Sequence, residues 1–155
     1  MRTISWWAIE FLIAIKFPDV KQLSTENLAQ WRSDNSRSDP LLLDARTNEE
    51  YRVSHLLDAK LVPSNLKDLV ESEIDYTTPI VVYCSVGYRS SAIARRLKSL
   101  GYENVFNLSG SIFQWVNENR SVYREGKQVT TVHPYHQFWQ YLLVSKKYKY
   151  IKRET

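Results

Sequence analysis

The sequence predicts an α/β fold with a mainly parallel central sheet and helices on both of its faces. Short apolar runs alternate with segments of helical periodicity, a pattern typical of parallel sheets. Two of the runs, Leu41–Leu43 and Ile80–Tyr83, are apolar throughout, as expected of strands covered on both faces. The links between these segments are short. In a parallel sheet built in this way, we expect right-handed crossovers and a ligand site beyond the carboxyl ends of the strands.

The expected strands are short, and most are rich in branched or aromatic apolar residues. The third is stopped by Pro63, and the fourth, which Pro79 opens, gives the strongest strand signal in the chain. A polar stretch, 33–40, separates the first helix from the second strand and is expected to be a loop. In chain order the predicted strands are Val20–Leu23, Leu41–Leu43, Lys60–Val62, Ile80–Tyr83 and Val105–Leu108.

Capping residues and helical spacing place the helices between these strands. Ser24 can cap the first, whose Leu28 and Trp31 face inward, and Thr47 with Glu50 has the spacing of a capping box. Three more helices follow, one capped by Ser64, one ended by Gly101 and one after the last strand. Their apolar positions are Leu66, Leu69 and Val70; Ile93, Leu97 and Leu100; and Ile112, Trp115 and Val116.

The chain divides into an apolar N-terminal segment (1–19), a central domain (20–120) and a C-terminal extension with a basic tail (121–155). The stretch Ile4–Ile15 is too short to span a membrane and lacks a clear signal-peptidase site. We expect it to form a helix that packs on the domain or on a partner, and consider a membrane-surface contact the less favoured alternative.

The C-terminal extension is expected to contain a final helix that packs back on the domain. Four apolar residues indicate this helix: Phe138, Trp139, Leu142 and Leu143. The basic residues beyond it are interleaved with Tyr148 and Tyr150, and we expect a solvated, fraying terminus there. These basic residues are Lys146, Lys147, Lys149, Lys152 and Arg153.

The composition of the chain limits the classes of protein to which it can belong. With 155 residues, 43% of them hydrophobic, the chain suits one domain with its own core. Its formal charge of +4 is modest and does not indicate nucleic-acid binding. A single cysteine, Cys84, excludes an intramolecular disulfide within this chain. That fits a reducing compartment, so we expect a cytoplasmic protein.

Residues 84–90, Cys-Ser-Val-Gly-Tyr-Arg-Ser, lie between the strongest strand and a helix. A loop that enters a helix N-terminus directs unpaired N–H groups and positive potential into one small space, so it binds anions and stabilises a thiolate. Gly87 permits a turn that a side chain would block. Arg89 adds a fixed charge that could bind a substrate anion or lock the loop through backbone carbonyls and a carboxylate.

A lone cysteine at the end of a strand is often simply a core residue. The glycine and arginine in the same loop favour instead a nucleophilic cysteine in an anion-binding loop. From the residues alone, the leading chemistries are sulfur transfer, phosphate-ester hydrolysis and arsenate reduction.

Four motifs in order resemble those of the rhodanese homology family, over about 20–119. Cys84, Gly87 and Arg89 are similar to its C-x-x-G-x-R loop, and Asp44 with Arg46 to its D-x-R motif. The remaining matches are Glu50 and Tyr51; Ser54, His55, Leu56, Ala59 and Pro63; and Leu108, Gly110, Ile112 and Trp115. Departures fall on turns, where Ser54, Asp58 and Ser111 replace glycines and Leu57 replaces a proline, and in the loop, where Ser85 replaces a basic residue.

The resemblance implies a rhodanese-like fold and a sulfurtransferase that carries sulfane sulfur as a persulfide on Cys84. Ser85 to Tyr88 place four residues between cysteine and arginine, whereas phosphatase-like relatives and arsenate reductases have five. The shorter loop therefore favours a sulfur substrate. The backbone of the active-site loop would bind the persulfide; its residues after the cysteine are Ser85, Val86, Gly87, Tyr88, Arg89 and Ser90.

The resemblance also assigns supporting roles and partners. Asp44 and Arg46 are expected to tie strand ends together, and His55 to be a structural hydrogen-bonding residue. No cofactor or metal is expected. The partners would be a small donor such as thiosulfate and an external acceptor, either cyanide, a thiol or an acceptor protein, because no second cysteine is present in the chain. The alternative is a non-catalytic binding or regulatory module.

Overall fold

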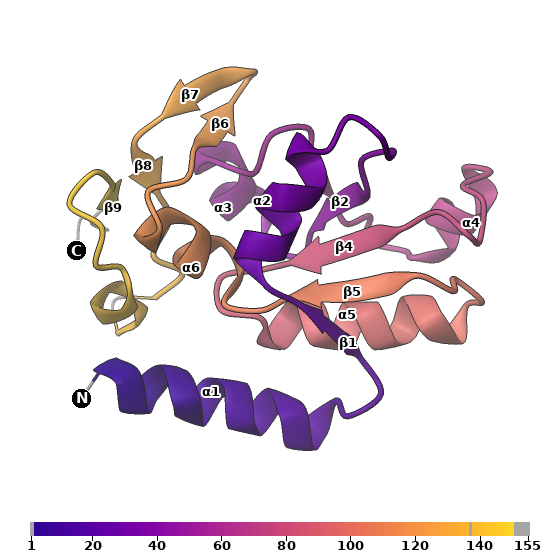
Figure 1. Cartoon of the computed structure of the whole chain (residues 1–155), viewed down its shortest axis with the longest axis horizontal. Helices are drawn as coiled ribbons and strands as arrows, with labels where there is room; N and C mark the ends of the chain where they lie inside the picture. The colour runs from indigo at the N-terminus through magenta and orange to yellow at the C-terminus, as the bar shows by residue number, and fades with distance from the viewer. Residues whose placement is uncertain (1, 137, 151–155) are drawn as a thin grey trace.

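A computed structural model describes residues 2–136 and 138–150, without the side chains of residues 2–5. Its centre is a five-stranded sheet of order β1-β5-β4-β2-β3 in which every neighbouring pair is parallel. This confirms the predicted fold class (Figure 1). The strands are β1 (Lys21–Leu23), β2 (Leu41–Asp44), β3 (Lys60–Leu61), β4 (Ile80–Tyr83) and β5 (Val105–Leu108).

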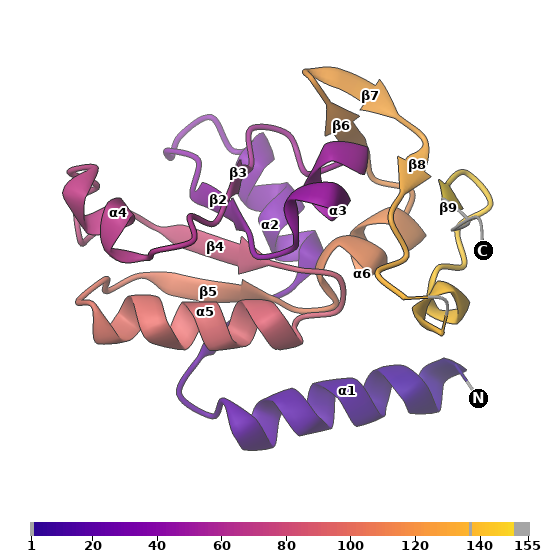
Figure 2. The ribbon, with the colours of Figure 1, turned by 180° about the vertical axis from the view of Figure 1, so that it is seen from behind.

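Helices cover both faces of this sheet. Side chains of α2 and α6 belong to the hydrophobic cluster on one face, and those of α1, α4 and α5 to the cluster on the other. Figures 1 and 2 show α5 lying along the sheet, with α1 outside it. The helices are α1 (Arg2–Lys16), α2 (Thr25–Ser33), α3 (Asn48–Val53), α4 (Lys67–Glu71), α5 (Tyr88–Ser99) and α6 (Ser111–Asn117).

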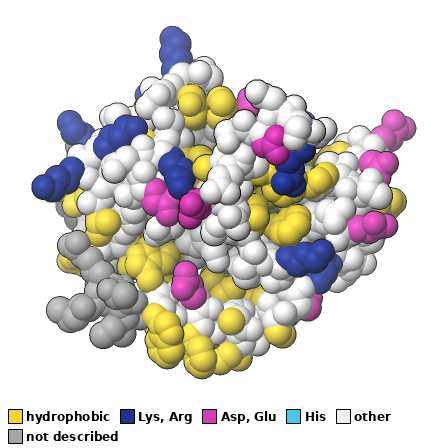
Figure 3. All heavy atoms as spheres, in the orientation of Figure 1, with side chains coloured by type: hydrophobic (Ala, Val, Ile, Leu, Met, Phe, Trp, Pro, Cys, Tyr) yellow, Lys and Arg dark blue, Asp and Glu magenta, His cyan; other side chains and the backbone are white. Residues whose placement is uncertain are grey.

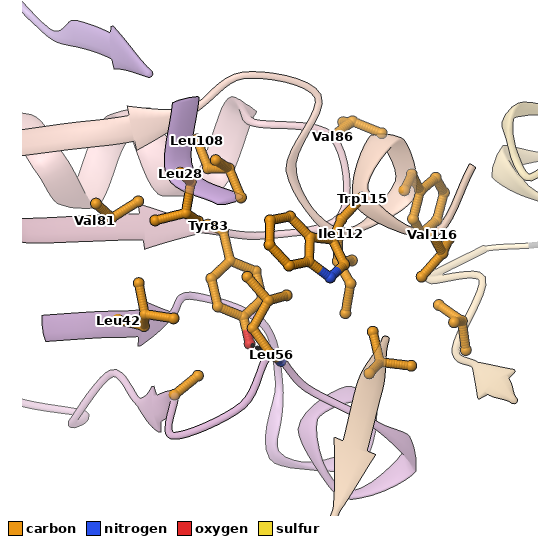
Figure 4. Close-up of a cluster of buried hydrophobic side chains, with 14 of the residues drawn as sticks. Leu28, Leu42, Leu56, Val81, Tyr83, Val86, Leu108, Ile112, Trp115 and Val116 are labelled. Carbon is orange, nitrogen blue, oxygen red and sulfur yellow. Dashed lines mark hydrogen bonds between the residues drawn. The ribbon is translucent and has the colours of Figure 1, made fainter. Parts of the chain in front are cut away.

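Successive residues of the central strands supply the two clusters in turn, because side chains alternate across a strand. Leu42 and Val81 belong to the cluster under α2 and α6, whereas Leu43 and Val82 belong to the cluster under α5. Figure 4 shows the first cluster, in which Tyr83 reaches from β4 and its hydroxyl accepts a hydrogen bond from the Leu56 N–H at 3.1 Å. All four residues of β4 are buried, as its continuous apolar run predicts.

Two of the three predicted N-terminal helix caps are confirmed and one is wrong, and Gly101 ends α5 with a left-handed φ of +103°, as predicted. Ser24 caps α2, and Thr47 with Glu50 forms the complete capping box of α3. Ser64 does not cap α4, which begins only at Lys67. Instead the Asn65 side chain accepts a hydrogen bond from the Lys67 N–H at 3.2 Å, an Asx contact that the apolar pattern cannot reveal.

The N-terminal helix α1 packs on the domain. Ile13 and Phe17 are 5% and 2% exposed and join the cluster beneath α5. The opposite side of α1 remains exposed, and its Trp7 and Phe11 rings stack with centroids 5.2 Å apart. None of the helices in the described ranges is both long and apolar enough to cross a bilayer.

The C-terminal extension differs from its prediction. The expected final helix is a single turn, η1 (Trp139–Leu142), and Phe138 is 69% exposed. Two small sheets surround it: antiparallel β6 (Val122–Arg124) with β7 (Lys127–Val129), and parallel β8 (Thr131–Val132) with β9 (Lys149–Tyr150). The residues of the turn supply too few apolar contacts for a longer helix, since only Leu142 of η1 is buried.

The basic side chains Lys146, Lys147 and Lys149 are exposed, as predicted, but the predicted fraying is wrong up to residue 150. Tyr148 is 9% exposed and packs in the cluster beneath α6, and its hydroxyl donates to the Arg120 carbonyl. Lys149 pairs with Thr131 in the β8–β9 ladder. The buried Tyr148 ring anchors this segment, which counts of basic residues could not show. Lys152 and Arg153 lie outside the described residues.

Candidate functional site

Cys84 follows β4, a central strand of the sheet, and is 1% exposed. Its N–H donates to the Ser111 hydroxyl at 3.1 Å, and its carbonyl accepts from the Ile112 N–H at 3.2 Å. The carbonyl of Ser85 likewise accepts from the Phe113 N–H at 3.2 Å. The start of α6 therefore holds the beginning of the cysteine loop, at the carboxyl edge where a parallel sheet places its ligand site.

Two polar groups approach the sulfur of Cys84. The Gly87 N–H donates to Sγ at 3.1 Å, and the Ser90 Oγ lies 3.4 Å from Sγ. The Ser90 hydroxyl is also 2.6 Å from the Asn107 Oδ1, and Asn107 donates through Nδ2 to Gln22 at 2.7 Å. The buried Asn107, itself hydrogen-bonded to the exposed Gln22, thus positions Ser90 beside the sulfur, with a hydroxyl proton available to either acceptor.

Gly87 adopts a left-handed conformation that the loop requires. Its φ is +107°, and a Cβ at this position would lie 3.3 Å from both the Asn107 amide nitrogen and the Ile13 Cδ1. Glycine meets both constraints because it has no side chain. With this turn the chain enters α5 at Tyr88, so the last three residues of the predicted loop form the first helical turn.

Arg89 locks the loop through a carboxylate, one of the two roles expected for it. Its guanidinium donates to both oxygens of Glu50, at 2.9 and 2.8 Å, and to the Ser85 hydroxyl at 3.0 Å. Ser85 in turn donates to Glu50 at 3.1 Å, so the carboxylate joins α3 to both ends of the loop. Glu50 was identified only as part of a motif and a capping box, and its pairing with Arg89 was missed.

The electrostatics of the pair follow from burial and hydrogen bonding. Burial opposes ionisation of Glu50, yet hydrogen bonds from Arg89 and the Thr47 backbone outweigh it and lower its pKa to about 2. Burial likewise opposes the charged form of Arg89, and its hydrogen bonds to Glu50 outweigh that penalty, so the pKa of Arg89 is raised. Both groups are therefore charged, and each already has a partner.

Asp44 and Arg46 lie apart from the sulfur and make a structural contact. Their side chains form a fully buried ion pair at 2.6 Å, and Arg46 also donates to the Ser54 carbonyl at 2.6 Å. His55 stacks on Tyr51 with ring centroids 4.0 Å apart, and its Nδ1 lies 3.0 Å from the Tyr51 carbonyl. These contacts join β2 to the segment after α3, and none of them involves the loop sulfur.

Above Cys84 lies a cavity of about 240 Å³. Four of its lining residues come from outside the segment with motif matches: Ile9 and Leu12 of α1, and Tyr135 and Trp139 of the extension. These were missed, because only the folded chain brings both termini over the loop. The remaining lining residues belong to the cysteine loop and the start of α5, and are Cys84, Ser85, Val86, Tyr88 and Arg89.

Ser111 shows how one departure from the family pattern is accommodated. It stands where the late motif has a second glycine, and it keeps a positive φ of 50°. Its hydroxyl donates to the Leu108 carbonyl at 3.0 Å and accepts from the Cys84 N–H. The serine thus adds a side-chain contact to the backbone of Cys84 that glycine could not make.

The whole of the central sheet lies within a segment that matches a known family, apart from the first strand. The model of the rhodanese-like domain matches residues 24–118 of the chain. The chain belongs to the rhodanese-like domain family. Among solved structures, a thiosulfate sulfurtransferase from Pseudomonas aeruginosa superposes with a TM-score of 0.64 at 21% identity, covering 75% of this chain and 22% of that one. A rhodanese-like domain from an Anabaena protein gives 0.59 at 23% identity, with 68% and 80% covered; both show a shared fold.

Two sequence relatives of this rhodanese-like protein carry sulfur-transfer names, and a third is named as a hydroxylase. A sulfurtransferase of Allochromatium vinosum is 35% identical over 62% of this chain and 88% of its own length. The adenylyltransferase and sulfurtransferase uba4 of Ogataea parapolymorpha is 33% identical over 61% of this chain, which spans only 23% of that protein. A tRNA uridine(34) hydroxylase of Chlamydia muridarum is 26% identical over 61% of this chain and 30% of its own length. Together the relatives support sulfur transfer in general.

Proposed function

We propose that this rhodanese-like protein is a sulfurtransferase that carries sulfane sulfur as a persulfide on Cys84. The observation that carries the proposal is the setting of the sulfur, which lines a cavity and accepts a hydrogen bond from the Gly87 N–H at 3.1 Å. The thiolate is the form of cysteine that attacks sulfur. When it is buried, hydrogen-bond donors such as this one stabilise its negative charge. The same donor and the Ser90 hydroxyl would stabilise the negative outer sulfur of a persulfide.

The first half-reaction loads the cysteine. The Cys84 thiolate attacks the outer sulfur of a donor such as thiosulfate, and a new sulfur–sulfur bond forms on the enzyme. The donor's own sulfur–sulfur bond breaks, and sulfite leaves with the bonding electron pair. The enzyme is left with a persulfide anion on Cys84, and the total charge is unchanged.

The second half-reaction unloads it. An external nucleophile, which is cyanide, a thiol or the cysteine of an acceptor protein, attacks the outer sulfur, and the Cys84 thiolate departs. With cyanide the product is thiocyanate. Cys84 is the only cysteine of the chain, so no second thiol of this chain can take the sulfur internally. The proposed kinetics are therefore ping-pong.

The other residues of the site would position the loop. We assign Arg89 and Glu50 to holding its shape, Ser85 to bridging them, and Asp44 with Arg46 to supporting the strand end. Residues 20–120 would form the catalytic domain, with 1–19 and 121–155 as additions to it. We place the protein in the cytoplasm, where a single free cysteine remains reduced.

Thiocyanate formation from thiosulfate and cyanide tests the proposal, with Cys84→Ser beside the wild type. The serine is nearly isosteric, so folding should be preserved, and turnover should fall by at least about a thousandfold because the nucleophile is lost. Wild-type protein that gains no sulfur from any donor would contradict the proposal. That result would favour the alternative, a binding module that keeps the fold.

A further inference from the structure

The cavity above Cys84 has an apolar outer wall, which an anion-binding site would not have. Ile9 and Leu12 reach it from α1, and Trp139 reaches it from η1. These two elements contact one another, so the N-terminal helix and the C-terminal extension meet over the cysteine loop (Figures 1 and 2). Figure 3 shows the apolar side chains that continue outward over α1 at the lower edge of the molecule.

The one cationic residue among the described residues that line the cavity is Arg89. Glu50 occupies its guanidinium with two hydrogen bonds, and Tyr135 lies against it with its ring centroid 4.4 Å from Cζ. Ser85 adds a hydroxyl that is itself hydrogen-bonded to Glu50. A dianion such as thiosulfate would therefore enter without an uncommitted positive side chain, against an apolar wall.

The size of the cavity indicates what would fill it instead. Its volume of about 240 Å³ is larger than the roughly 150 Å³ that suffices for a benzene ring in a protein core. The sulfur of Cys84 lies on the inner side of this space, within the loop, and the apolar side chains face it from the two terminal segments. A sulfur-bearing group could thus reach Sγ while its substituent contacts Leu12 and Trp139.

We propose that the cavity selects sulfur donors or acceptors that carry an apolar, ring-sized substituent, and that Leu12 and Trp139 determine this preference. The inference rests on the proposed sulfur transfer and names its substrate class. In the loading step the Cys84 thiolate attacks the outer sulfur of an organic thiosulfonate anion. The persulfide forms on Cys84, and the organic sulfinate leaves with the electron pair of the broken sulfur–sulfur bond.

Benzenethiosulfonate and methanethiosulfonate carry the same single negative charge and the same reactive group. They differ in the size of the apolar substituent, so comparing them tests the substituent alone. We expect the kcat/KM of the full chain for benzenethiosulfonate to exceed that for methanethiosulfonate by about tenfold or more. An apolar group in a pocket that fits it gives discrimination of that order. The same ratio measured with free cysteine sets the intrinsic difference between the leaving groups. The enzyme's ratio should exceed it.

Variants of the wall decide whether the cavity causes the preference. Leu12→Ser changes a residue that is 51% exposed, so folding should tolerate it, and Trp139→Ala enlarges the cavity from the other side. Both should lower the donor ratio several-fold. Phe11→Ser and Phe138→Ala are the matched controls, since they alter exposed apolar neighbours that do not line the cavity, and they should keep the wild-type ratio.

The outcomes separate this inference from the function on which it rests. If both donors load Cys84 but the enzyme's ratio equals that of free cysteine, or if the wall variants keep the wild-type ratio, the apolar-substrate inference is overturned and sulfur transfer stands. If neither donor nor thiosulfate loads the wild type, sulfur transfer itself fails, and the inference fails with it.

Discussion

Glu50 is a 1% exposed carboxylate whose charge serves both its own helix and the cysteine loop. It closes the capping box of α3 and binds Arg89 with two hydrogen bonds. Its pKa is about 2 in the folded protein and 4.5 in the absence of these contacts. The ionised side chain therefore stabilises the fold fully above about pH 5, and this contribution is lost as the pH falls toward 2.

Glu50→Gln removes that pH-dependent contribution. The pKa difference corresponds to about 3 kcal/mol, so the variant should be less stable than the wild type by that order at pH 7. At about pH 3 the difference in unfolding free energy between the two proteins should fall to roughly half. At this pH the Glu50 carboxylate takes up a proton when the wild type unfolds, so its charge stabilises the fold less. Urea unfolding at the two pH values measures it. An equal gap at both would mean that Glu50 does not stabilise the fold through its charge.

At the residue scale, the sequence locates only those site residues that are contiguous. Cys84, Gly87 and Arg89 lie within one short segment, whose position between strand and helix is itself a signal. The pairing of Arg89 with Glu50 depends on how α3 packs against the loop, across 39 residues of chain. Tyr135 could be assigned to the cavity only after folding, because nothing in its local pattern relates it to Cys84.

At the scale of an element, helix α1 also combines a feature that the sequence predicts with one that only the folded chain decides. Its apolar character predicts a packed helix, but apolar residues occur on every side of the helix and so do not show which face is buried. The structure buries Ile13, which is 5% exposed, and leaves Ile15 63% exposed. The buried face meets the cluster under α5, so α1 is an integral layer of the domain.

Matched substitutions at these two isoleucines test the orientation of α1. Ile13→Ala should cost about 2–4 kcal/mol of unfolding free energy, because it deletes buried methylenes and leaves a cavity. Ile15→Ala should change stability by no more than about 0.5 kcal/mol. Thermal or urea unfolding of the two variants measures the difference. Equal losses, or a larger loss at Ile15, would contradict the packing described for α1.

Helix ends were predicted well where a side chain caps the helix, and poorly where tertiary contacts decide. Ser24 and Thr47 carry their own capping signal, and both caps are present. The turn η1 does not become a longer helix, because it lies in the connection between β8 and β9 and only Leu142 of the turn is buried. Apolar spacing over so short a stretch does not distinguish the two results.

At the scale of the whole molecule, the sheet and its strands were predictable because the apolar runs alternate with helices along the chain. The strand order places β4 between β5 and β2, and so carries Cys84 to the middle of the carboxyl edge. The apolar residues of the extension predicted that it packs back on the domain, as Leu142 does, but its return over this same edge was not predictable. It depends on Val132 and Tyr148, whose burial in the cluster under α6 is a property of the folded chain.

The extension should therefore unfold with the domain and not ahead of it. Hydrogen exchange read by mass spectrometry should show strong protection in peptides that cover 122–132, where Val122 and Val132 are both 0% exposed. The exposed loop 34–39 should exchange much faster and serves as the internal reference. Exchange in 122–132 as fast as in this loop would show that the extension is not part of the folded unit.

The central claim is that Cys84 carries the transferred sulfur, and the most direct measurement is the mass of the protein after incubation with thiosulfate or benzenethiosulfonate. We predict a gain of one sulfur atom, on the peptide that contains Cys84, which disappears when cyanide is added. Cys84→Ser should gain nothing. A wild-type chain whose mass stays unchanged with every donor, or a sulfur gain that persists in Cys84→Ser, would contradict it.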